Sequence, residues 1–497
     1  MIDNKKLIRS SLWLTASQIS GTLISFLISI IIIKSLDVNA YADYGIIISY
    51  SMGLTMISYL GIPNIIQRYL PEKFVDKAYG DILSILTTGF YLRTVTIFVF
   101  LTISIGVILL FNLRPAENLT LLAAVIFVYV VGRSFFVIIE EGFNALKKQD
   151  NLFVLKTLTG LAKLISILLI LFYHKLNVYY ILIIFGAYEL LGSVVAILYL
   201  AKKFDVSIKP VGFSIYKFTK THIRFGFFNY LSQLQHFVLS HSFEIIIISL
   251  ILSKNLVAEY TFSVTISTIM ISLIPISAVV KGIYPLLIEK YYQTKSHSLL
   301  TDLLNEFISF IVIVYSLLTV FVIINIKPII RLLGKNEYLN TDYVIIILFL
   351  LGLISVVSTP LKIGLIILED AKSLFKANFS FFPVIVLLPV AVHYFGINGV
   401  LSVAFLSLAS IIILRIIFLQ KDLNGKLFNI KIYKVISVLF IAVLLSFFVK
   451  YFFDSELMKF LSSILLIVML LYSYGKLNLI PPMLNDFLTY FKIRTVE

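Results

Sequence analysis

The chain has 497 residues, of which 60% are hydrophobic and only 13% are charged, with a formal net charge of +15. Soluble domains carry about 25% charged residues, so this composition excludes a soluble globular protein. The apolar residues occur in blocks of roughly 20, the length that crosses a bilayer as a helix. Because these blocks do not alternate between polar and apolar residues as barrel strands do, we expect an all-α polytopic membrane protein. The sequence has no cysteine, which excludes disulfides and thiolate chemistry.

The transmembrane topology follows from the positions of the apolar blocks and of the cations. In chain order, the blocks predict about fourteen membrane-spanning helices, at residues 12–33, 45–65, 92–112, 119–139, 157–173, 179–200, 225–251, 262–284, 307–326, 343–368, 378–395, 399–420, 435–453 and 459–475. Most of the 41 Lys and Arg fall in segments that share a membrane face with the N-terminus. Such a bias in short loops sets orientation, so we expect both termini in the cytoplasm. The basic net charge is then topological, and no nucleic-acid partner is expected.

The order of short motifs indicates an internal duplication. Ala42-Asp43-Tyr44 follows the first predicted span, and Ala258-Glu259-Tyr260 follows the seventh, 216 positions later. We therefore predict two parallel six-helix pseudo-repeats with a pseudo-twofold axis along the membrane normal. This is the plan of transporters that bind substrate between their halves. The predicted domains are residues 1–205 for the first half, 206–425 for the second half, 426–480 for two appended helices, and 481–497 for a cytoplasmic amphipathic tail.

Charged residues inside the predicted spans form the candidate site, because a charge at mid-bilayer costs roughly 2.5–3.5 kcal/mol unless it meets a partner or a wet cavity. The candidate substrate-binding residues are Arg133, Lys163, Lys281, Lys362 and Arg93. Arg133 and Lys163 lie deepest, and two interpretations stay open for them: contact with a diphosphate or acidic sugar in a cavity, or a structural ion pair with Glu189. For the other three, nearer the inner ends of their spans, snorkelling to the cytosolic surface is the simpler interpretation.

A second group of candidates has a coupling or structural role, and its members are Glu244, His241 and Glu189. His241 and Glu244 stand three positions apart and share a helix face. They form either a proton-sensitive pair or a packing contact between helices. The sequence contains neither an HExxH pattern nor a GxxxxGK[ST] loop, so we expect no metal site, no direct use of ATP and no cofactor.

Several motifs resemble one transporter family when taken in order. They are Ala42-Asp43-Tyr44-Gly45, Glu259-Tyr260, the stretch 332–338, and Gly396-Ile397-Asn398-Gly399-Val400. In these features the chain resembles the Wzx-type polysaccharide and O-antigen flippases of the multidrug/oligosaccharidyl-lipid/polysaccharide exporter superfamily. The acidic residue in the middle of span seven is usually Asp in that family, and here it is Glu244.

The resemblance implies a transport function rather than an enzymatic one. The substrate would be an undecaprenyl-diphosphate-linked oligosaccharide, such as a repeat unit of O-antigen in lipopolysaccharide biosynthesis or of another surface polysaccharide. It would cross the bacterial cytoplasmic (inner) membrane by alternating access through a cationic central cavity. The implied partners are this lipid-linked substrate, membrane lipid, and a polymerase or other glycan assembly proteins.

Three alternatives stay open. A cation-coupled multidrug antiporter of the same superfamily should carry a clear buried acidic site, but the cations inside these spans outnumber the acids. An integral membrane polymerase or ligase acting on lipid-linked sugars should place its chemistry in a large outer loop, whereas the outer loops predicted here are all short. A scaffold protein of a glycan assembly complex would give no reason for buried cations in both halves.

Overall fold

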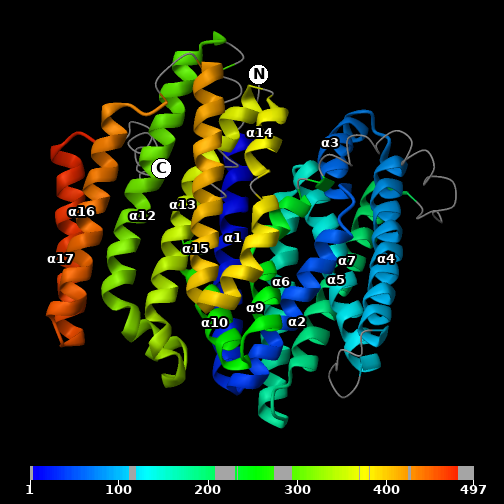
Figure 1. The fold of residues 1–497 in the computed structure, drawn as a ribbon. Coiled ribbons are helices and arrows are strands. Elements are labelled where there is room, and N and C mark those ends of the chain that lie inside the picture. The colour runs from blue at the N-terminus through cyan, green and yellow to red at the C-terminus, as the bar shows by residue number, and fades with distance from the viewer. Residues whose placement is uncertain are drawn as a thin grey trace, which may run out of the picture. The chain divides into compact units, whose positions relative to one another are not determined.

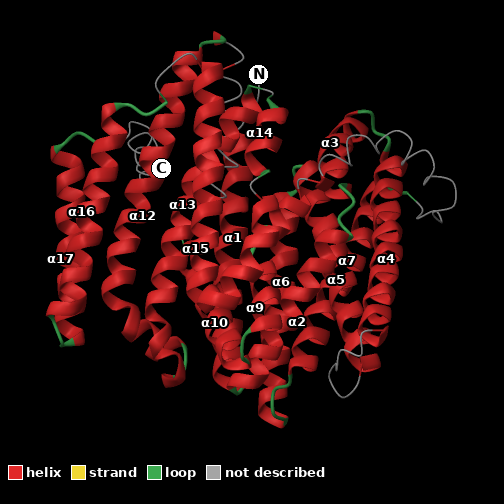
Figure 2. Cartoon of the chain, in the orientation of Figure 1, coloured by secondary structure: helices red, strands yellow, loops and turns green. Residues whose placement is uncertain are grey.

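The computed structural model describes residues 4–110, 119–206, 230–231, 233–273, 291, 294–368, 370–379, 381–423 and 427–479. Throughout this part of the chain the regular elements are helices, and no strand occurs in it (Figure 2). Ten helices within the described residues are long and apolar enough to cross a membrane, or eleven when one bent pair is counted as a span. The prediction of an all-α polytopic membrane protein is therefore confirmed. The predicted tail 481–497 lies outside the described residues.

The chain divides into two compact units, Met1–Thr261 and Phe262–Glu497. The first unit contains α1 (Asn4–Ser35), α2 (Val38–Ile57), α3 (Ile62–Val75), α4 (Tyr79–Leu110), α5 (Leu119–Ala145), α6 (Gln149–Tyr173), α7 (Val178–Phe204), α9 (His241–Ile251) and the start of α10 (Lys254–Ser272) (Figure 1). The second contains α12 (His297–Leu333), η1 (Asn336–Thr341), α13 (Asp342–Ile367), α14 (Ala371–Asn378), α15 (Phe381–Leu423), α16 (Ile430–Phe452) and α17 (Glu456–Lys476). The predicted boundary between halves at residues 205 and 206 stays a prediction.

One predicted span differs from the observed helices at a glycine, and a second glycine lies where the prediction separates two spans. The predicted span 45–65 is a pair of helices, α2 and α3, that meet at an angle of 50°. Gly61 at the break has a φ of 69°, in the left-handed region that glycine adopts without a steric penalty. Gly396, with a φ of 57°, interrupts α15 between the predicted spans 378–395 and 399–420. Parts of the predicted spans 225–251 and 262–284 lie outside the described residues.

The side chain of Arg93 on α4 binds the C-terminal end of α2, next to the break between α2 and α3. Its side chain is fully buried, and Nη2 donates to the carbonyl of Thr55 at 2.9 Å, whereas Nη1 donates to the carbonyl of Ser134 on α5 at 3.2 Å. The guanidinium also lies 5.6 Å from the centroid of the Tyr59 ring. The last carbonyls of a helix lack intrahelical partners and form the negative end of its dipole, so a cation at the end of α2 is favourable there. This geometry replaces the snorkelling interpretation of Arg93.

We predict that Arg93→Lys reduces the amount of folded protein, because a single ammonium cannot donate to both carbonyls as the planar guanidinium does. Each hydrogen bond to a charged group contributes roughly 1.5–3 kcal/mol, so the loss should be severe. Arg68→Gln is the control, since Arg68 forms an exposed ion pair with Glu72. The measurement is the monodisperse fraction of detergent-extracted protein, and equal yields for both variants would contradict the prediction.

A close helix crossing in the first unit joins α5 and α7 at two glycines. A Cβ on Gly132 would lie 2.1 Å from the carbonyl oxygen of Gly186, and a Cβ on Gly186 would lie 2.6 Å from Cα of Tyr129. Small residues of this kind let membrane helices approach backbone to backbone. The crossing brings Arg133, the neighbour of Gly132, close to Glu189, one turn after Gly186.

We predict that Gly186→Ala destabilises the protein by about 1–3 kcal/mol or more, because the new methyl group meets the backbone of α5, which cannot rotate away. Gly21→Ala on α1 is the matched control, since nothing lies within 4 Å of the position that its Cβ would occupy. Thermal unfolding of the purified variants in detergent measures the difference. A wild-type melting temperature for Gly186→Ala would show that the helices separate there without cost.

The two triplets that indicated a duplication lie at one helix crossing within the first unit. The alanines of both triplets are fully buried. Beside them, a Cβ on Gly45 of α2 would lie only 2.4 Å from Oγ1 of Thr261 on α10. Residues 45 and 261 have the same offset as the triplets, so a position contacts its own equivalent. Such a contact is expected at the axis of a twofold repeat.

The second unit is built around α12, which packs against α13, α16 and α17. Two polar contacts join these helices inside the unit. Nζ of Lys450 on α16 lies 2.9 Å from Oδ2 of Asp342 at the start of α13, and the Tyr474 hydroxyl on α17 donates to Ser316 of α12 at 3.1 Å. Polar contacts therefore link α16 to α13 and α17 to α12, in addition to the apolar packing between these helices.

Candidate functional site

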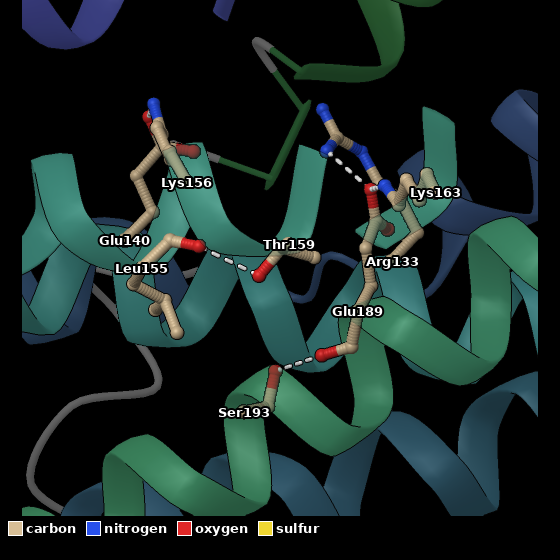
Figure 3. Close-up of polar contacts among 8 residues, drawn as sticks. All are labelled: Arg133, Glu140, Leu155, Lys156, Thr159, Lys163, Glu189 and Ser193. Atoms are coloured by element: carbon tan, nitrogen blue, oxygen red, sulfur yellow. Dashed lines mark hydrogen bonds and ion pairs between the residues drawn. The ribbon is translucent and has the colours of Figure 1, made fainter. Parts of the chain in front are cut away.

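The deepest charged residues of α5, α6 and α7 form one cluster (Figure 3). Oε1 of Glu189 accepts a hydrogen bond from Nζ of Lys163 at 2.7 Å and another from Nη1 of Arg133 at 3.2 Å. Both cations therefore contact Glu189, the partner that one of the two interpretations from the sequence gave them. Both cations share one carboxylate, so the cluster retains a net charge of +1.

The three side chains of the cluster differ in their solvent exposure. The exposed fraction is 7% for Glu189, 13% for Lys163 and 33% for Arg133. The guanidinium has five N–H donors and the ammonium has three, and each uses one of them on Glu189. The ammonium of Lys163 also lies 5.2 Å from the centroid of the Phe185 ring. The cluster therefore has spare donors, and Arg133 is the member most accessible to an incoming anion.

Glu189 has a further hydrogen bond, which involves its backbone and not its carboxylate. Its backbone carbonyl accepts a hydrogen bond from Oγ of Ser193 at 2.7 Å, one turn further along α7 (Figure 3). Its second carboxylate oxygen, Oε2, is buried and has no hydrogen-bond partner among the residues that the structure describes. The carboxylate is therefore bound through one oxygen only.

A polar stripe on α6 faces the other two helices of the cluster. Its members are Lys156, Thr159, Lys163 and Ser166, which stand three or four positions apart and so share a helix face. Lys156 forms an ion pair with Glu140 of α5, and Oγ of Ser166 lies 2.7 Å from the hydroxyl of Tyr188 on α7. Of these four residues, only Lys163 was a candidate from the sequence, although the spacing of the polar residues was a signal that could have found the others.

The remaining cationic candidates do not join this cluster. Arg93 is buried against backbone carbonyls, as described above. Lys362 of α13 is half-buried and forms no ion pair with any described residue. Lys281 lies outside the described residues. Another buried cation of the second unit, Arg415, donates to Ser358 and to Asn378, which are neutral. For these residues a role in substrate binding stays a prediction.

His241 and Glu244 do meet, as their spacing predicted. Nδ1 of His241 lies 2.6 Å from Oε2 of Glu244, and the hydroxyl of Tyr260 donates to the same oxygen at 2.6 Å. Glu244 is buried, and its carboxylate binds a histidine from its own helix and a tyrosine from α10. The described residues contain no group of three or more His, Asp or Glu that could hold a metal ion.

Comparison with known proteins agrees with this architecture. The model of the family described as polysaccharide biosynthesis protein matches residues 7–291, more than half of the chain. No curated protein matches the sequence. The fold is similar to that of the lipid II flippase MurJ in an inward closed conformation, with a TM-score of 0.68 and 16% identity over 95% of this chain and 99% of that one.

Two multidrug transporters have a similar fold. One is a multidrug resistance MATE family transporter of the MOP superfamily in an inward-facing conformation, with a TM-score of 0.60 and 16% identity over 83% of this chain and 98% of that one. The other is the MATE multidrug transporter DinF-BH, with a TM-score of 0.58 and 14% identity over 85% of this chain and 96% of that one. The chain is thus a multi-pass membrane protein of the polysaccharide biosynthesis protein family, with the fold shared by the flippase and multidrug transporters of the MOP superfamily.

Proposed function

We propose that the chain is a flippase that moves an undecaprenyl-diphosphate-linked oligosaccharide across the bacterial cytoplasmic membrane. The substrate would be a repeat unit of O-antigen or of another surface polysaccharide. The observation that carries the proposal is the cluster of two membrane-embedded cations on the single carboxylate of Glu189, which leaves an excess positive charge beside an accessible guanidinium. The family match supports a role in polysaccharide biosynthesis, and the similarity to a lipid II flippase supports a lipid-linked substrate.

The residues of the cluster suit a diphosphate. The guanidinium of Arg133 presents a planar fork that matches phosphate oxygens, and the ammonium of Lys163 is a compact point charge beside it. The polyprenyl tail remains in lipid while the polar head crosses, which requires a lateral opening in the protein. Binding the head near the membrane midplane and exposing it to each side in turn would complete transport. No covalent change to the substrate is involved.

The second candidate is a cation-coupled multidrug antiporter, because the MATE transporters share this fold. The observation in its favour is Glu244, a buried acid of the kind that coupling to an ion requires. His241 and Tyr260 already occupy one of its oxygens in this structure. A flippase accounts for two deep cations, Arg133 and Lys163, that share the single carboxylate of Glu189, whereas these cations would hinder an exporter of cationic drugs.

The orientation of the chain is also a proposal, namely that both termini lie in the cytoplasm. We predict that a cysteine at Asn336 reacts with an impermeant maleimide added to intact cells, and that one at Lys372 reacts only after the membrane is opened. The two positions flank α13 and are both exposed, so they lie on opposite sides of one span. The protein has no native cysteine, which makes the labelling specific. The reverse pattern would invert the topology.

We predict that Arg133→Gln and Lys163→Gln each lower surface glycan about tenfold or more at normal protein abundance, because a hydrogen bond from a charged group contributes roughly 1.5–3 kcal/mol. Lys156→Gln is the matched control, since Lys156 stands on the same face of α6 but is paired with Glu140. Immunoblots of the glycan and of the membrane fraction measure both quantities.

Two other outcomes of this experiment have different meanings. If the cations only stabilise the bundle, the single variants will lose folded protein, and surface glycan will fall only in proportion to protein abundance. If both single variants export glycan at the wild-type rate and abundance, Arg133 and Lys163 have no role in transport.

A further inference from the structure

We propose that Glu189 is an internal counter-anion, which occupies the anion site of the resting protein and is displaced by the substrate's phosphate during transport. This inference rests on the diphosphate site proposed above and assigns a role to the carboxylate within it. Glu189 would stand in for phosphate when the site is empty, and it would compete with phosphate when the substrate is released.

The contacts of the carboxylate are those of a replaceable ligand. Lys163 and Arg133 converge on the same oxygen, at 2.7 Å and 3.2 Å, as two cations converge on one phosphate oxygen. Arginine binds a carboxylate most strongly through two parallel hydrogen bonds, yet Arg133 makes a single long one. Oε2 of Glu189 has no partner in the described part of the chain. The pairing is therefore weaker than the same residues could achieve.

The surroundings of Glu189 keep it in place while the cations can turn to a new partner. The α5–α7 crossing fixes the backbone one turn before it, through Gly132 and Gly186. The backbone carbonyl of Glu189 is held by Ser193 one turn after it. Arg133, by contrast, has a third of its side chain exposed. An incoming phosphate would meet Arg133 first and Lys163 second, and Glu189 would remain behind them.

Electrostatics explain why the site contains an anion at all. Two unpaired cations inside a bilayer would cost roughly 2.5–3.5 kcal/mol each on an insertion scale, and one carboxylate removes most of that cost. A diphosphate carries more negative charge and more acceptor oxygens than a carboxylate, so it can displace Glu189 from the two cations. The displaced carboxylate is then buried without a partner, which favours its return and the release of the substrate. Binding and displacement are thus coupled in both directions.

The test compares the binding of geranyl diphosphate, a water-soluble prenyl diphosphate, to purified full-length wild type and Glu189→Gln in nanodiscs. We expect Glu189→Gln to bind about tenfold more tightly, because the competing anion is gone. Geraniol, which lacks the diphosphate, should show no such gain. The matched control is Glu140→Gln, which removes the carboxylate of the ion pair between α5 and α6 and should leave the affinity unchanged.

Transport gives an independent readout of the same inference. Glu189→Gln should export less glycan than the wild type despite binding more tightly, because release no longer has a competing carboxylate. A purely structural carboxylate would lower export through abundance alone, with no gain in affinity. The combination of tighter binding and slower export at equal abundance is specific to displacement.

The remaining outcomes are decisive as well. If the wild type binds geranyl diphosphate and Glu189→Gln binds no more tightly, the counter-anion role is overturned and the diphosphate site stands. If neither binds, the counter-anion role is overturned, and if Arg133→Gln also exports normally, the proposed function fails with it. Should Glu189→Gln not fold, Glu189→Asp keeps the charge but withdraws the carboxylate from the cations. Affinity of Glu189→Asp equal to or below that of the wild type would then refute the proposal.

Discussion

The cost of placing charge inside a bilayer governs the interior of this protein. Every buried cation described in the first unit has acceptors, and those acceptors connect helices that are distant in sequence. Arg93 joins α2 and α5 through their carbonyls, and the pair Arg133 and Lys163 joins α5 and α6 to α7 through Glu189. Because an unsatisfied charge is expensive in lipid, these contacts constrain which helices can pack together.

The geometry of the cluster depends in turn on two glycines, Gly132 and Gly186, which have no side chains. At Gly132 and Gly186 the backbones of α5 and α7 approach too closely for a Cβ on either residue. Lipid offers no hydrophobic driving force between helices, so close backbone packing and polar contacts must supply the association. The two features reinforce each other, because the crossing sets the distance over which Arg133 reaches Glu189 and the ion pair stabilises the crossing.

One contact in the first unit agrees with the predicted duplication, which stays a prediction. Gly45 faces Thr261, which stands at the offset of the two triplets and carries a hydroxyl where Gly45 has no side chain. A side chain at position 45 would collide with Thr261, so glycine permits this contact. In the same unit, the buried acid of α9, Glu244, is bound by His241 and Tyr260 rather than by Lys or Arg.

The sequence by itself determined the fold class, the positions of most spans and the identity of the deep charges. Hydrocarbon imposes these features locally, through the length and apolarity that each span requires. It also determined that His241 lies beside Glu244, because residues three positions apart on a helix share a face. Only the tertiary structure decided that Arg133 and Lys163 share one carboxylate, and that Arg93 binds backbone carbonyls rather than reaching the membrane surface. Those choices depend on which helices adjoin and how closely, and no periodicity within a single helix encodes the contact between residues on separate ones.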